Sequence, residues 1–168
     1  MAVSNGLTIT FFIVIITALA VGYGLGAKRG VLPFSAEVGF SEGQWSFLRW
    51  WVKLALIVGV LLPLVLWAQT GAQSSSPSFW RSYLLVLTVQ LLSERVFSKW
   101  LVSSVVVPLG FSYTAFRLWQ LLDGFTRLSL SGWAGMGFVC LVLFWGANGV
   151  MLMTVAIPTV YEGRRIHE

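Results

Sequence analysis

Three long apolar runs with almost no charge decide what this chain can fold into. They cover 7–25, 50–67 and 133–157, and Lys53 is the one charged residue within them. At about 1.5 Å of rise per residue, a helix over each run would cross most of a hydrocarbon layer of about 30 Å. Only 10% of all residues are charged, whereas soluble domains carry about 25%. We therefore expect an all-α, polytopic membrane protein that forms a single integral membrane domain over 1–168.

A fourth apolar stretch is interrupted by charges. It begins like a helix, with Ser76 as a candidate N-cap and Pro77 at the first helical position. Further along it contains Glu94, Arg95 and Lys99. A charge at the centre of a bilayer costs about 2.5–3.5 kcal/mol unless it is paired or reaches the interface. We expect any functional chemistry to be concentrated here.

Two topologies fit this central stretch. In one, a helix from Pro77 to about Val107 spans the membrane over 79–101, and an amphipathic helix over 112–122 lies along the interface. In the other, Glu94–Lys99 is a tight turn and a further span follows, which gives five transmembrane helices. The turn would have to form in SERVFSKW, which contains no Gly, Pro, Asn or Asp. We therefore favour four transmembrane helices plus one interfacial helix.

The basic residues indicate an orientation. Either topology places eight Lys and Arg residues on one side of the membrane and three on the other. The positive-inside rule then places the connector over 27–46 on the cytoplasmic or stromal side. With four spans, both termini lie opposite that connector. The basic residues lie at segment ends and form no stripe with exposed aromatic residues, so we expect no nucleic-acid partner.

Few side chains of the usual catalytic types are present. The chain has one cysteine, Cys140, and one histidine, His167. An intrachain disulfide, a zinc or haem site of the usual kind and a Ser-His-Asp triad are therefore excluded. We expect no metal site and no enzymatic activity. The least supported alternative is a lipid-directed enzyme with an acid-base site assembled from Glu94, Ser98, Tyr113 and Asp123.

Glu94 is the main candidate site residue. Gln90 precedes it by four residues, so both lie on one helix face. Glu94 can form a structural pair with Arg95, Lys99 or Arg117, and Arg117 is the best candidate because its planar guanidinium suits a carboxylate. Glu94 can instead hold an ion or proton. In a third interpretation, Gln90, Glu94 or Asn148 holds the magnesium of a chlorophyll.

Other residues indicate helix packing. Gly22 and Gly26, with Ala18, form a ridge of small residues that would let another helix approach closely. Asn148, in the last apolar run, is interpreted first as a hydrogen-bonding residue between helices and second as a ligand. The nine tryptophans fit an interfacial belt, and they also fit contact with lipid, carotenoid or chlorophyll.

Several of these residues also carry a family resemblance. Gln90 and Glu94, then Pro108, Tyr113 and Arg117, and finally Phe144-Trp145 with Asn148 recur in the same order. From about Tyr83 to Tyr161, the chain resembles a family of small, uncharacterised membrane proteins of plants and oxygenic phototrophs. The resemblance implies a four-helix fold and a photosynthetic membrane such as the thylakoid, and it implies no activity.

These patterns lead to one expected function and its alternatives. We expect a non-catalytic accessory or assembly subunit of a larger membrane complex, with the lipid bilayer and other membrane protein subunits as its partners. The first alternative is a small oligomeric channel or transporter that uses Glu94 as its ion or proton site. The second is a protein that binds a pigment or a lipid.

Overall fold

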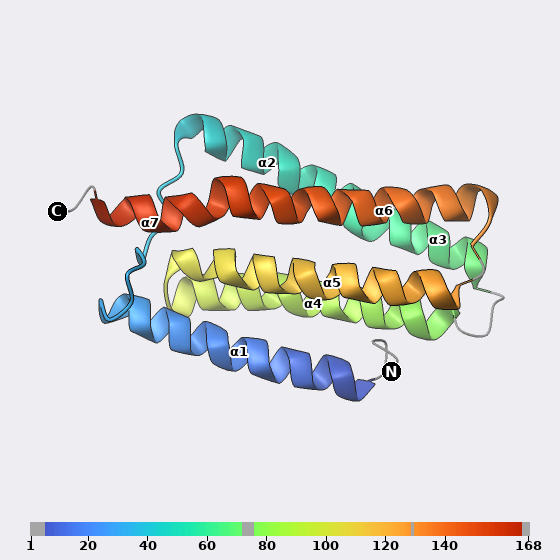
Figure 1. Cartoon of the computed structure of the whole chain (residues 1–168), viewed down its shortest axis with the longest axis horizontal. Helices are drawn as coiled ribbons and strands as arrows, with labels where there is room; N and C mark the ends of the chain where they lie inside the picture. The colour runs from blue at the N-terminus through green and yellow to red at the C-terminus, as the bar shows by residue number, and fades with distance from the viewer. Residues whose placement is uncertain (1–5, 72–75, 129, 166–168) are drawn as a thin grey trace.

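The computed structural model describes residues 6–71, 76–128 and 130–165, and all regular structure in this part of the chain is helical (Figure 1). Five rods follow one another along the chain. The bounds of their segments are α1 (Gly6–Lys28), α2 (Glu42–Leu56), η1 (Ile57–Leu61), α3 (Leu62–Thr70), α4 (Ser76–Trp100), η2 (Ser103–Val105), α5 (Val106–Arg127), α6 (Gly132–Met151), η3 (Leu152–Ala156) and α7 (Ile157–Arg165).

The α4–α5 hairpin is the centre of the bundle. Its two helices run antiparallel, with α1 on one side and the α6–α7 rod on the other, and α3 packs on α4 and α6 (Figure 1). The ring of Phe12 on α1 stacks on Phe116 of α5 with 3.9 Å between the ring centroids. On the opposite side, Trp80, Tyr83 and Trp145 belong to an aromatic core shared by α3, α4, α5 and α6. The hairpin is thus covered by protein on two sides.

In the part of the chain that the structure describes, three rods are long and apolar enough to cross a membrane: Gly6–Lys28, Glu42–Thr70 and Gly132–Tyr161. They contain the runs predicted over 7–25, 50–67 and 133–157, so the expected all-α class and the apolar spans are confirmed at this coarser level. The chain is consistent with a multi-pass integral membrane protein.

The second rod begins earlier than predicted. Its first helical residue is Glu42, because Ser41 and Gln44 form a capping box. The Ser41 hydroxyl accepts a hydrogen bond from the Gln44 N–H at 3.3 Å, and the Gln44 side chain accepts one from the Ser41 N–H at 2.8 Å. This S-x-x-Q pattern is a sequence signature of a helix start, and its own polar residues extend the helix beyond the apolar run.

Two rods contain a π-helical turn just before a proline. η1 precedes Pro63, and η3 precedes Pro158. Proline has no N–H to donate and crowds the carbonyl four residues earlier, so a helix must adjust near it. The helix accommodates Pro63 by one wide turn, η1. The carbonyl of Gly59, four residues before Pro63, accepts a hydrogen bond from the Tyr83 hydroxyl at 3.2 Å.

The predicted helix from Pro77 to Val107 is correct as far as Trp100 and wrong beyond it, and the helix predicted over 112–122 has different bounds. α4 ends at Trp100, a short connection with η2 follows, and 112–122 is the middle of α5. Pro108 lies in the first turn of α5. A backbone N–H has no helical partner at this position, so a proline is tolerated there and α5 can begin before it. The tight turn proposed for Glu94–Lys99 is also wrong, because those residues are helical.

The reversed α5 also changes the expected position of the termini. α1 begins at one end of the bundle and α7 finishes at the other, the same end as the 29–41 connector (Figure 1). We expected both ends of the chain to lie opposite this connector because we expected no reversal after α4. With the reversal, the end of α7 lies beside the connector instead.

The predicted ridge of small residues on α1 is not the face that packs against the hairpin. Gly22 has open space around the position of a Cβ atom, and a Cβ on Gly26 would meet Leu32 of the following connector. The face that packs against the hairpin contains Ala20 and Gly24 instead, and a Cβ on Gly24 would come within 2.7 Å of Leu101. Close approach of a helix from another subunit to the open ridge stays a prediction.

Candidate functional site

Three side chains form a polar chain between α4 and α5. Arg117 Nη2 donates a hydrogen bond to Gln90 Oε1 at 2.6 Å, and Gln90 Nε2 donates one to Glu94 Oε1 at 2.7 Å. The i, i+4 spacing places Gln90 and Glu94 on one face of α4, as the sequence indicated, and the reversal of the chain brings Arg117 opposite them. Gln90 therefore links the cation to the carboxylate, where a direct pair was expected.

Arg117 lies in an aromatic setting. Its side chain is fully buried, and its Cζ lies 3.9 Å from the ring centroid of Trp145 and 5.6 Å from that of Tyr83. Nε and Nη1 have no hydrogen-bond partner among the described residues. A cation over an aromatic face away from water gains about 2 kcal/mol. The two rings thus stabilise a charge that would otherwise be costly to bury.

The aromatic residues around Arg117 are held by hydrogen bonds of their own. Trp145 Nε1 donates to the Tyr83 hydroxyl at 2.8 Å, and that hydroxyl donates to the Gly59 carbonyl at 3.2 Å. A Cβ on Gly59 would lie 2.8 Å from Trp145 Cζ2. The absence of a side chain at Gly59 therefore lets the Trp145 ring approach η1 closely.

Asn148 connects three rods. Its Oδ1 accepts a hydrogen bond from Trp51 Nε1 at 2.8 Å, and its Nδ2 donates one to Thr114 Oγ1 at 2.8 Å. The residue is buried on α6, Trp51 lies on α2 and Thr114 on α5. Because the oxygen and the nitrogen of its amide are both engaged, the geometry fits the predicted hydrogen-bonding role between helices better than a ligand role.

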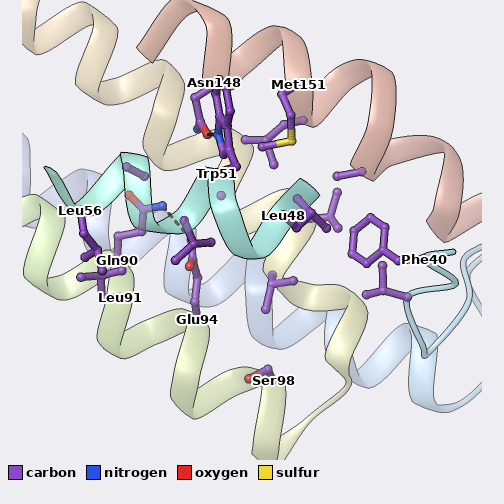
Figure 2. A pocket seen from close by; sticks show the side chains of 18 of the residues that line it. Phe40, Leu48, Trp51, Leu56, Gln90, Leu91, Glu94, Ser98, Asn148 and Met151 are labelled. Carbon is purple, nitrogen blue, oxygen red and sulfur yellow. Dashed lines mark hydrogen bonds between the residues drawn. The ribbon is translucent and has the colours of Figure 1, made fainter. Parts of the chain in front are cut away.

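A cavity of about 480 Å³ lies between α2 and the rest of the bundle. Figure 2 shows it extending from Phe40 in the connector to Leu56 at the end of α2, with Glu94 on its floor below Trp51. Its walls are mostly apolar and come from α2, η1, α4, α5, α6 and η3. The volume lies within the range of about 300–1,000 Å³ that is typical of small-molecule sites.

α2 is the loosely held wall of this cavity. It has no fully buried residue, and its Trp50 and Val52 are more than half exposed. The Trp51 indole, stacked on Phe144 with 5.4 Å between centroids and hydrogen-bonded to Asn148, connects α2 to α6. The cavity therefore has one wall that fewer contacts hold in place.

The other predicted site residues lie elsewhere. Arg95 and Lys99 are exposed, and no ion pair joins either of them to Glu94 among the described residues. Gly22 and Gly26 are on α1, away from the cavity. Sequence reasoning did not single out Tyr83, Trp51 and Gly59. Gly59 could have been found from the proline that follows it by four residues in an apolar run. No sequence pattern indicates that Tyr83 would bond to Trp145 and Gly59, or Trp51 to Asn148.

Comparison with protein-family models, curated proteins and solved structures found no match to this chain. Among the described residues, no three His, Cys, Asp or Glu side chains are grouped so that they could hold a metal ion. The site is therefore interpreted from its geometry alone.

Proposed function

We propose that this protein binds one lipid-like molecule within the membrane, in the cavity beside α2. The observation that carries the proposal is the placement of Glu94 in a cavity whose other walls are mostly apolar. Gln90 donates a hydrogen bond to Glu94 and is itself held by Arg117. Sites for small molecules combine apolar walls with a few placed polar groups that fix orientation. A guest with an apolar body and a polar end fits this pattern.

We also propose that the α4–α5 hairpin crosses the membrane, which gives five spans. Between Arg81 and Arg95, the outward residues of α4 include Leu85 and Leu92, each more than half exposed. On α5, Trp119, Leu122 and Phe125 are exposed in the same way, while Thr114, Arg117 and Gln120 are buried. Apolar residues outside and polar residues inside are the arrangement expected of a helix pair in lipid.

The test of the proposed function is what the protein carries when it is purified. We expect mass spectrometry of organic extracts, taken after mild detergent solubilisation, to find one lipid-like species near equimolar amount. Ala55→Phe would fill the cavity from α2, whereas Ala147→Phe would add the same ring on the exposed face of α6. The species should be lost from the first variant and kept by the second. Equal recovery from both would contradict the proposal.

Chlorophyll and carotenoid belong to the same broad class of apolar guests. The expectation that Gln90, Glu94 or Asn148 holds a pigment stays a prediction, and the visible absorption spectrum of the purified protein tests it directly. In Gln90 and Asn148, both ends of the amide are hydrogen-bonded to protein. In Glu94, Oε2 accepts no hydrogen bond from the described residues, so Glu94 is the best placed of the three to bind a pigment.

The role of an accessory subunit in a photosynthetic membrane also stays a prediction, and it is compatible with lipid binding. Native-gel migration after mild solubilisation tests it, because a subunit should migrate well above the size of one chain. An ion or proton path through Glu94 is the remaining alternative. Flux into proteoliposomes that is unchanged in Glu94→Gln would remove it.

A further inference from the structure

Among the described residues that line the cavity, Glu94 carries the one charged side chain, and one of its carboxylate oxygens has no protein partner. The Asn148 amide is engaged by Trp51 and Thr114, and both ends of the Gln90 amide are engaged as well. The Ser98 hydroxyl donates to the Arg95 carbonyl at 3.2 Å. Glu94 uses Oε1 to accept from Gln90, while its Oε2 accepts no hydrogen bond from the described part of the chain. A guest that donates a hydrogen bond would complete this carboxylate.

The charges around Glu94 limit the charge of that guest. Arg117 carries a positive charge at all physiological pH values, and Glu94 is the carboxylate joined to it through Gln90. The two formal charges cancel within the bundle. A cationic guest would add an uncompensated positive charge at membrane depth, and an anionic guest would face the Glu94 carboxylate. Either arrangement is costly where water is scarce.

We infer that the site is built for an uncharged molecule with a single long apolar chain and a terminal hydroxyl, and that this hydroxyl donates to Glu94. The inference rests on the proposed function and specifies the head group of its guest. The cavity has a volume of about 480 Å³, which suits one slender molecule. It extends along α2 from Phe40 to Leu56 (Figure 2). A long-chain or isoprenoid alcohol represents this chemical class.

The experiment uses three probes that share one spin-labelled chain and differ in the head group: an alcohol, an amine and a carboxylic acid. The spin label quenches tryptophan fluorescence, and Trp45, Trp51 and Trp145 line the cavity. We expect saturable quenching of the full-length protein in nanodiscs, with the alcohol binding at least tenfold more tightly than the amine or the acid. Ala55→Phe should abolish the saturable part, and Ala147→Phe should leave it unchanged.

Glu94→Gln then tests the charge argument. Without the carboxylate, Arg117 lacks its counter-charge, so the acid should become the tightest of the three probes. Glu94→Asp keeps the charge and should keep the preference for the alcohol. Arg95→Gln removes an exposed charge one residue away and should also keep it. A role of Glu94 in folding alone would not exchange the preferred head group.

The outcomes separate the two proposals. If the wild-type protein binds the amine or the acid as tightly as the alcohol, or if Glu94→Gln leaves the order unchanged, the inference about the head group is wrong while binding in the cavity stands. If none of the three probes gives saturable quenching that Ala55→Phe removes, the proposed function fails as well.

Discussion

At the scale of single residues, Arg117 is the most constrained side chain that the structure describes. It is fully buried in α5, it donates to Gln90, and it lies against the faces of Trp145 and Tyr83. Without a counter-charge, burying the guanidinium would cost more free energy than the packing of one side chain usually returns. We interpret Glu94 as the compensating charge and Gln90 as the group that sets the distance between the two.

A double-mutant cycle measures this coupling. Glu94→Ala and Arg117→Leu each remove one charge, and leucine is chosen because Ala at a fully buried position would add the cost of a cavity. We expect a coupling of about 1.5–3 kcal/mol, the range for hydrogen bonds to charged groups, in thermal or denaturant melts of the purified protein. The control cycle pairs Glu94→Ala with Arg95→Leu and should show no coupling. Equal coupling in the two cycles would remove the pairing.

A second prediction concerns the attachment of α2. Trp51→Phe keeps an aromatic ring to stack on Phe144 but removes the N–H that donates to Asn148. Hydrogen bonds between helices in membranes contribute about 0.6 kcal/mol on average, so the loss of stability should be small. The exposed Trp50 supplies the matched control, because Trp50→Phe breaks no such bond. An equal effect of the two variants in thermal melts would contradict a role for the Asn148 contact.

At the scale of helices, the two faces of α5 explain why its sequence pattern alone favoured an interfacial helix. Its apolar and polar residues do lie on opposite faces, and that pattern fits two environments. At an interface the polar face meets water, but inside a membrane bundle it meets other helices. Arg117 and Gln120 are fully buried and Trp119 is half exposed, which is the pattern expected of the second arrangement. Periodicity reports that two faces differ and does not report which one faces outward.

The face by which α1 packs on the hairpin gives a third prediction. Gly24→Ala would place a Cβ 2.7 Å from Leu101 Cδ1 and 2.8 Å from its Cβ, so a backbone must move. Overpacking of this kind costs about 1–3 kcal/mol. Gly22→Ala, two residues away, meets open space and should leave the melting temperature unchanged. If Gly22→Ala is the more destabilising change, the predicted ridge was right and the register of α1 described above is wrong.

At the scale of the whole molecule, the basic residues gather at one end of the bundle. That end includes Lys28, Arg29, Arg49, Arg95, Lys99, Arg164 and Arg165, whereas the other has Arg81 and Arg127. From this bias the positive-inside rule predicts that the 29–41 connector, the α4–α5 turn and the end of α7 lie on the cytoplasmic or stromal side. This arrangement requires that both helices of the hairpin cross the membrane.

Cysteine labelling in sealed vesicles tests this topology, in a Cys140→Ser background. We expect Ser41→Cys and Ser103→Cys to react from the cytoplasmic side, and Gly71→Cys and Ser131→Cys to react from the other. All four positions are exposed and lie at the ends of helices. An interfacial α5 would instead place Ser131→Cys on the same side as Ser103→Cys.

The sequence was sufficient for the helical class and for the three most apolar spans, because those depend on length and hydropathy. It was also sufficient for the shared face of Gln90 and Glu94, which follows from helical periodicity. It was insufficient for the role of Gln90 as a bridge, since the reversal at Leu101 and Val102 contains none of the residues that usually mark a turn. The cavity was out of reach too, because it depends on how α2 leans away from α6.

The central claim is that a lipid-like molecule binds in the cavity beside Glu94, and photocrosslinking tests it directly. A long-chain alcohol with a photoreactive chain would be added to the full-length protein in nanodiscs, and the adducts mapped by mass spectrometry. We expect adducts on Val52, Leu56 and Leu91, which face the cavity, with loss of the adducts when unlabelled alcohol competes or when Ala55 is changed to Phe. Adducts spread over the exposed faces of α1 and α6, at Phe11, Leu19 and Leu143 for instance, and insensitive to competition, would contradict it.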